Sequence, residues 1–311
     1  MNLRPLTLLC ASLLLAAAAS AQTPSGAAAP SAQAPPAAVP ASSGGPLTRH
    51  YRDGETLTYH MTAANDDWHY TADASSVAKK TASGGYVEEF RWTGMTSNGQ
   101  PIALAPAMVQ FRETLSLDPN WMPSGPDLSK VDLQLVGPIT DLMTFYVDLW
   151  LMNKVGILQH PGDHFYVPNP QVASWADGTH VLIGTDHIDF DLNLQSIDPV
   201  KGTAVVVVRH VPPSSPNLQL PAEWMRAPVA DTPNNWVEVT KTKDGKYQAE
   251  VGKETFDVSM TVSTADGRIL SASMDNPVVM SARGCDDAAL TKCGDAQQHT
   301  IHRHVEIVLE H

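Results

Sequence analysis

The chain has 311 residues, with 20 lysines and arginines against 33 aspartates and glutamates, and its formal net charge is −13. An acidic protein repels phosphate backbones and anionic lipid headgroups, so this composition argues against nucleic acid as a partner. Removal of the N-terminal segment described next takes away only one charge, that of Arg4, and leaves a net charge of −14.

Residues 1–21 have the pattern of a secretory signal peptide. Arg4 supplies the positive charge, Leu6–Ala18 is the apolar segment, and Ala19–Ala21 is a small-residue cleavage site. The apolar segment is shorter than the roughly 20 residues that a membrane span needs. We therefore expect a mature chain without a transmembrane span, located in the periplasm or secreted.

Residues 22–48 are predicted to be a disordered linker rich in proline and alanine. Positions 22–46 carry no charge, and Val39 is their only large apolar residue, so they cannot bury enough surface to offset the entropy of ordering. The folded part is then 49–311. No second low-complexity stretch interrupts it, and its length suits a single β-rich domain.

Strand patterns dominate the folded part. Apolar and polar residues alternate, as in half-buried strands, in the segments 55–61, 85–92, 187–194, 255–262 and 301–309. Thr203–Val211 is apolar on both faces, which predicts a central strand. Asp-Gly pairs at 244–245 and 266–267 are typical of tight hairpins between antiparallel strands.

One helix is predicted at Pro138–Gly156, where the proline suits the first turn and the glycine suits a stop. Its side chains are apolar almost all the way round, and such a helix is buried on most sides. Asp141, Thr144 and Asp148 form a polar stripe, which we expect to face water. The predicted fold is mainly β (α+β): a strongly curved antiparallel sheet, as a half-barrel or open barrel, wrapped around one buried hydrophobic helix.

This pattern of the Pro138–Gly156 helix with the meander Thr203–Arg268 resembles the half-barrels of the outer-membrane lipoprotein carriers. Separately, SWADGT (174–179) and DTPNNWVEV (231–239) resemble segments of an uncharacterised family of exported bacterial β-rich proteins. The carriers hold acyl chains in the half-barrel, so the first resemblance implies a lipophilic ligand. The chain departs from the carriers in its size, its acidity, its cysteine pair and an insertion-like stretch, Leu115–Val136.

Three hypotheses for function follow. In the first, the protein is a non-enzymatic carrier whose cavity holds a small hydrophobic ligand. The expected lining residues on the helix are Leu142, Phe145, Leu149, Trp150 and Met152, and the candidates for the rim are Trp121 and Trp175. In the second, side chains fill the cavity, and the protein acts through its surface on a component of the cell envelope.

The third hypothesis is a metal-dependent hydrolase built on His160, Asp163 and His164. The intervening Pro161-Gly162 favours a turn over a ligand set. A second group, His302, His304 and Glu306, shares one strand face with a geometry that can chelate a divalent ion, but its apolar opposite face predicts that it points to solvent. No nucleophile elbow or phosphate-binding loop is present, so we expect no catalytic residue and no cofactor.

The number and positions of the cysteines agree with the predicted export of the protein. Cys10 lies in the signal peptide, and it leaves lipidation open as an alternative, although Leu9 occupies the position where lipoprotein processing prefers a small residue. The other two, Cys285 and Cys293, form an isolated pair, which predicts a disulfide in an exported protein. A two-thiolate metal site is the alternative and needs ligands from elsewhere in the chain.

Overall fold

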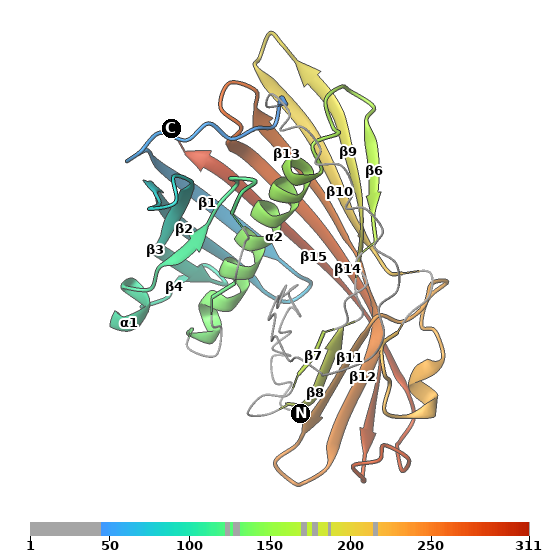
Figure 1. The fold of residues 1–311 in the computed structure, drawn as a ribbon. Coiled ribbons are helices and arrows are strands. Elements are labelled where there is room, and N and C mark those ends of the chain that lie inside the picture. The colour runs from blue at the N-terminus through green and yellow to red at the C-terminus, as the bar shows by residue number, and fades with distance from the viewer. Residues whose placement is uncertain are drawn as a thin grey trace, which may run out of the picture.

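The computed structural model describes residues 45–121, 125–126, 131–168, 173–175, 180–185, 188–213 and 217–310 (Figure 1). Within these ranges fifteen strands form one sheet, and all their pairings are antiparallel. The strands are β1 (Thr56–Ala64), β2 (His69–Lys80), β3 (Tyr86–Ser97), β4 (Gln100–Pro101), β5 (Glu113–Leu115), β6 (His164–Val167), β7 (Ala173–Trp175), β8 (His180–Thr185), β9 (Asp189–Asp198), β10 (Thr203–Val211), β11 (Trp236–Lys241), β12 (Tyr247–Glu254), β13 (Phe256–Ser263), β14 (Ile269–Cys285) and β15 (Gln297–Glu310). The helices are α1 (Pro106–Val109) and α2 (Leu133–Val155), with the 3-10 helix η2 (Glu223–Arg226). The predicted signal peptide lies outside the described residues.

The sheet divides into two branches at β14. Its undivided part runs β4-β3-β2-β1-β15-β14, and β5 also pairs with β3. One branch continues from β14 through β12, β11 and β8 to β7, and the other continues through β13, β10 and β9 to β6. The sheet curls around α2 without closing (Figure 1), which confirms the predicted curved antiparallel sheet around a buried apolar helix.

β12 and β13 pair one after the other with β14, and the two branches separate at the break between them. β12 ends at Glu254, and the facing strand carries Pro277, which has no N–H to give to a ladder. The amide of Asn276 donates to the carbonyl of Thr255 at 2.8 Å. The side chain of Asn235 exchanges two hydrogen bonds with the backbone of Glu254, at 2.9 and 3.2 Å. Amide side chains thus replace ladder bonds where the sheet divides.

Helix α2 begins at Leu133, five residues before the predicted start at Pro138. The carboxylate of Asp132 caps this earlier start by accepting from the N–H of Gln134 at 3.0 Å. Pro138 therefore lies inside the helix rather than in its first turn. The predicted stop is correct: Gly156 adopts the left-handed conformation at φ 68°, and its N–H donates to the carbonyl of Met152.

The segment Gln134–Val155 of α2 is long and apolar enough to cross a membrane, by length and composition alone. Its most apolar window is 72% buried inside the protein. The burial is that of a core helix, and the strands around it supply most of the hydrophobic core.

The predicted disulfide joins Cys285, at the end of β14, to Cys293. Replacing both cysteines by serine is expected to lower the free energy of unfolding by about 2–3 kcal/mol, because the short loop becomes free in the unfolded chain. Urea unfolding of the double variant, compared with the oxidised wild type, measures this. Equal midpoints for the two proteins would mean that the bond adds nothing to stability.

Candidate functional site

The apolar face of α2 is enclosed. Four of the predicted ligand-lining residues have exposed fractions of 0–1% and belong to the main hydrophobic core: Leu142, Phe145, Leu149 and Met152. A cavity wide enough for an acyl chain leaves some surface of its lining side chains accessible to a water-sized sphere. These four side chains have essentially none in this structure.

The three tryptophans of that hypothesis lie elsewhere. Trp150 is half-buried, and its ring N–H donates to the carbonyl of Asp118 at 3.2 Å. The backbone N–H of Trp121 donates to the same carbonyl at 3.0 Å, so these two residues do come together near the end of α2. The backbone of Trp175 ends β7, and its side chain lies outside the described residues.

The polar stripe of α2 faces the protein interior, which corrects the expectation that it faces water. Asp141 and Asp148 are 2% and 0% exposed, and Thr144 is half-buried. The guanidinium of Arg303, on β15, lies 2.5 Å from the Asp141 carboxylate, which also accepts a hydrogen bond from the hydroxyl of Tyr70. The stripe can be buried because the core face of the sheet supplies its partners.

Asp148 pairs with a histidine from the branch that contains β13, β10 and β9. The ring Nε2 of His210, on β10, lies 2.8 Å from the carboxylate, and both side chains are 1% exposed. Burial raises the pKa of Asp148, and the neighbouring His210 opposes this. Phe190 and Phe256 flank the imidazole, with ring centres 4.9 and 5.2 Å away. The other ring nitrogen, Nδ1, is buried and has no hydrogen-bond partner among the described residues.

Glu254 completes this group of ionisable side chains at the break between the two branches. It is 4% exposed, and Asn276 donates a hydrogen bond to its carboxylate at 3.2 Å. Burial raises the pKa of Glu254 to about 7, against the opposing effects of Asn276 and of the charges of Arg303 and His210. We call Asp141, Asp148, His210, Glu254 and Arg303 the fork cluster.

The free energy of unfolding of Glu254→Gln, relative to that of the wild type, is expected to increase as the pH rises. The unfolded carboxyl titrates near 4.5 and the folded one at about 7, so the folded wild type loses stability as the pH rises through this interval. The glutamine does not titrate, and the stability difference between the two proteins should grow by about 3 kcal/mol from about pH 4 to about pH 8. Urea unfolding at both pH values, with the exposed Glu223→Gln as control, measures it. A difference that stays constant would show that Glu254 does not titrate in this interval.

The side chains of the fork cluster do not form a metal site by distance. The one group of His, Cys, Asp or Glu side chains at ligand distance among the described residues lies elsewhere. Arg303, His210 and Glu254 were not predicted as site residues from the sequence. The sequence does contain a sign of the buried ion pair, because Arg303 interrupts the apolar face of its strand between Ile301 and Val305.

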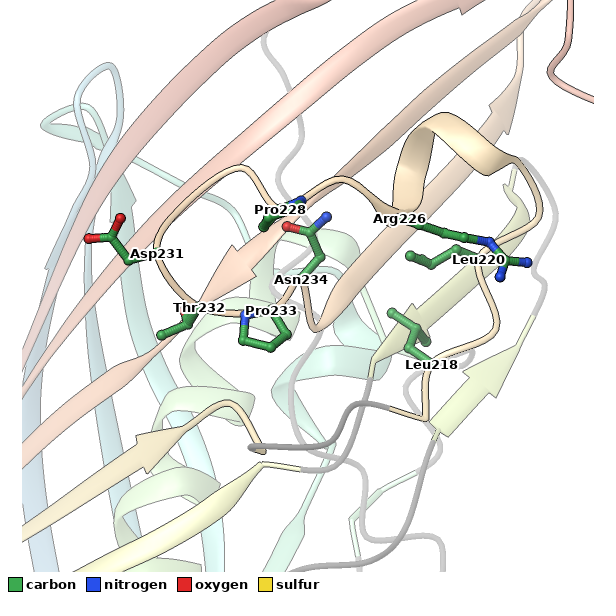
Figure 2. Close-up of a pocket in the computed structure, with 8 residues that line it drawn as sticks. All are labelled: Leu218, Leu220, Arg226, Pro228, Asp231, Thr232, Pro233 and Asn234. Atoms are coloured by element: carbon green, nitrogen blue, oxygen red, sulfur yellow. The ribbon is translucent and has the colours of Figure 1, made fainter.

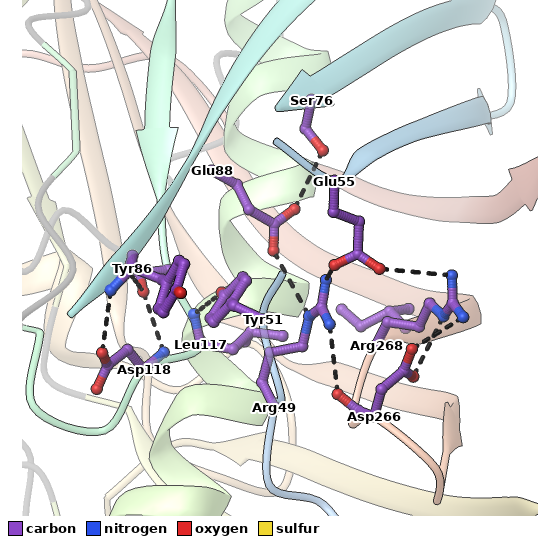
Figure 3. A network of polar contacts seen from close by, with 12 residues as sticks. Arg49, Tyr51, Glu55, Ser76, Tyr86, Glu88, Leu117, Asp118, Asp266 and Arg268 are labelled. Atoms are coloured by element: carbon purple, nitrogen blue, oxygen red, sulfur yellow. Dashed lines mark hydrogen bonds and ion pairs between the residues drawn. The ribbon is translucent and has the colours of Figure 1, made fainter. Parts of the chain in front are cut away.

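A second buried network joins the segment before β1 to α2, and Figure 3 shows the part of it around Arg49 and Glu88. Arg49 lies between two carboxylates, 2.5 Å from Glu55 and 4.0 Å from Glu88. Glu88 also accepts hydrogen bonds from the hydroxyls of Tyr146, on α2, at 2.9 Å and Ser76 at 3.1 Å. Burial raises the pKa of Glu88, and the Arg49 charge opposes this. The network fixes the segment before β1 against the helix.

The predicted hydrolase residues form a turn. The carboxylate of Asp163 accepts from the backbone N–H groups of Gln159 and His160, at 2.6 and 2.7 Å. His164 is turned to Asp191 on β9. His160 Nδ1 lies 3.7 Å from the Asp163 carboxylate, but the three residues do not bring three ligand atoms within 4.8 Å of one another.

A pocket of about 410 Å³ lies in the connection before β11 (Figure 2). Its lining residues are Leu218, Leu220, Arg226, Pro228, Asp231, Thr232, Pro233 and Asn234. Asn234 shapes the loop: its side chain accepts from the N–H of Val229 and donates to the carbonyls of Met225 and Ala227. The lining combines leucine and proline side chains with the guanidinium of Arg226 and the carboxylate of Asp231.

Comparison with protein-family models, with curated protein sequences and with solved structures gave no match. The resemblance to the lipoprotein carriers inferred from the sequence therefore finds no support in these comparisons.

Proposed function

We propose that the protein is an exported, non-enzymatic interaction protein whose curled sheet is a filled scaffold. The observation that carries this proposal is that the protein's own side chains occupy both the apolar and the polar face of α2. Leu142, Phe145 and Leu149 are 0% exposed on one face. On the other face, Asp141 and Asp148 have buried partners on the sheet. Function then lies on the surface, toward a component of the cell envelope.

Lipid extraction tests this proposal. The mature chain is purified and extracted for mass spectrometry, and it is titrated with a fluorescent fatty acid. The expected result is no retained lipid and no saturable uptake. One bound lipid per protein, lost in a Trp150→Asp variant, would contradict the proposal and support the hypothesis of a half-barrel carrier.

A second candidate function is the binding of a small lipophilic ligand outside the half-barrel, in the pocket before β11. The pocket volume of about 410 Å³ falls in the range of small-molecule sites, roughly 300–1,000 Å³. Leu218, Leu220 and Pro228 suit an apolar body, and Arg226 suits an acidic group on the ligand. Saturable fatty-acid binding that Leu218→Arg abolishes and Trp150→Asp leaves unchanged is the expected sign. If Trp150→Asp abolishes binding and Leu218→Arg leaves it unchanged, this pocket is not the binding site.

A further inference from the structure

Three potential metal ligands come together on the outer face of the sheet, the face turned away from the core. His60 on β1 lies directly opposite Asp73 on β2. Glu310 on β15 lies diagonally across from His60, because it pairs with Thr58. One potential ligand atom of each residue lies within 4.8 Å of the other two. Three adjacent strands thus bring together one imidazole and two carboxylates.

The backbone around Asp73 leaves room for its carboxylate. The pairing of β2 with β3 is irregular between Asp73 and Ala74, and the residue opposite Asp73 is Gly94. A Cβ atom at position 94 would lie 3.0 Å from a carboxylate oxygen of Asp73. A larger residue at position 94 would therefore crowd the carboxylate.

The group lacks a balancing cation. No lysine or arginine among the described residues forms an ion pair with Asp73 or Glu310; the ion-pair partner of Asp73 is His60, at 2.6 Å. Two carboxylates this close to one imidazole repel each other unless a positive charge lies between them. Such a charge can be a proton on the histidine or a metal ion.

We propose that His60, Asp73 and Glu310 bind one divalent transition-metal ion, with zinc the best fit. Zinc accepts mixed imidazole and carboxylate ligands at about 2.0–2.2 Å, and three protein ligands leave a fourth position for water. Calcium and magnesium prefer oxygen ligands alone. The ion would be held by a ring nitrogen of the neutral His60 imidazole, whose proton is then on the other ring nitrogen, and by one oxygen from each carboxylate. The proposal does not depend on the proposed function.

A neighbouring histidine provides a matched control. His304, on the same outer face, also lies between two carboxylates, with Nδ1 2.7 Å from Asp275 and Nε2 3.3 Å from Glu306. These contacts raise the pKa of His304, with the hydrogen bond to Asp275 the largest cause. Both ring nitrogens of His304 contact carboxylates, so a proton on this ring competes with any metal ion.

The test is calorimetric titration of the untagged mature protein with zinc chloride, after treatment with a chelator. Cobalt(II) absorption provides a second readout that reports tetrahedral coordination. The expected result is one site, with affinity weakened at least about tenfold in His60→Gln and in Glu310→Gln and unchanged in His304→Gln. All these side chains are on the exposed outer face, and circular dichroism checks that each variant folds.

Three results would overturn the proposal. If the wild type takes up no zinc, His60, Asp73 and Glu310 form only a surface ion pair. If zinc binds equally well to the His60 and Glu310 variants, the site lies elsewhere. Loss of binding in His304→Gln alone would move the site to the Asp275–His304–Glu306 group.

Discussion

Arg303→Met is expected to lower the free energy of unfolding by about 3–5 kcal/mol, because it leaves the Asp141 carboxylate buried without its cation. The side chains of Arg303 and Asp141 are 4% and 3% exposed, so water cannot replace the lost partner. Urea unfolding followed by circular dichroism measures the change. Adding Asp141→Asn should recover part of it, since no uncompensated charge then remains.

Arg209→Met is the matched control for this prediction. Arg209 forms a similar ion pair with Asp257 at 3.2 Å, but both side chains are more than half exposed. Exposed pairs of this kind contribute about 0.2–1 kcal/mol. Equal losses in the two variants would mean that the Asp141–Arg303 pair is not buried as described.

Phe145→Ala is expected to lower the free energy of unfolding by about 3–5 kcal/mol, because it removes a fully buried side chain and leaves a cavity in a close-packed core. The same variant should take up a small apolar probe such as benzene, measured as a rise in its thermal midpoint. The wild type should show no such rise.

Val147→Ala, at a half-buried position of α2, is the control and should cost clearly less. A small loss in Phe145→Ala, together with benzene uptake by the wild type, would indicate an empty cavity beside the helix. That outcome would contradict the filled scaffold and favour the carrier hypothesis.

The fold was predictable because its two strongest signals are local. Alternation in 301–309 and in 255–262 marks β15 and β13, although β15 extends further, to Gln297. The apolar surface of the helix predicted it, but its start was placed at Pro138 because the cap at Asp132 was not identified from the sequence. The full length of β14 was not predicted, since Pro277 in its middle argues against a continuous strand.

The site was less predictable because its residues are brought together from distant parts of the chain. Asp141 and Asp148 were identified as one stripe, but a polar stripe on a helix faces water in most proteins. Its burial depends on Arg303 and His210, 162 and 62 residues further along the chain. The polar residue on an otherwise apolar strand face is the local sign that could have revealed them.

The shared strand β14 has a consequence for how the molecule opens. The branch of β11 and β12 has its own small hydrophobic cluster, around Met225, Val237 and Val251, apart from the core that surrounds α2. β14 continues beyond the break to pair with β15 on its other edge, so it stays hydrogen-bonded if β12 detaches. Amide protons of β11 and β12 should therefore exchange with solvent well before those of β1 and β15. The protein then behaves as two cooperative units that share one strand, without a flexible linker between them.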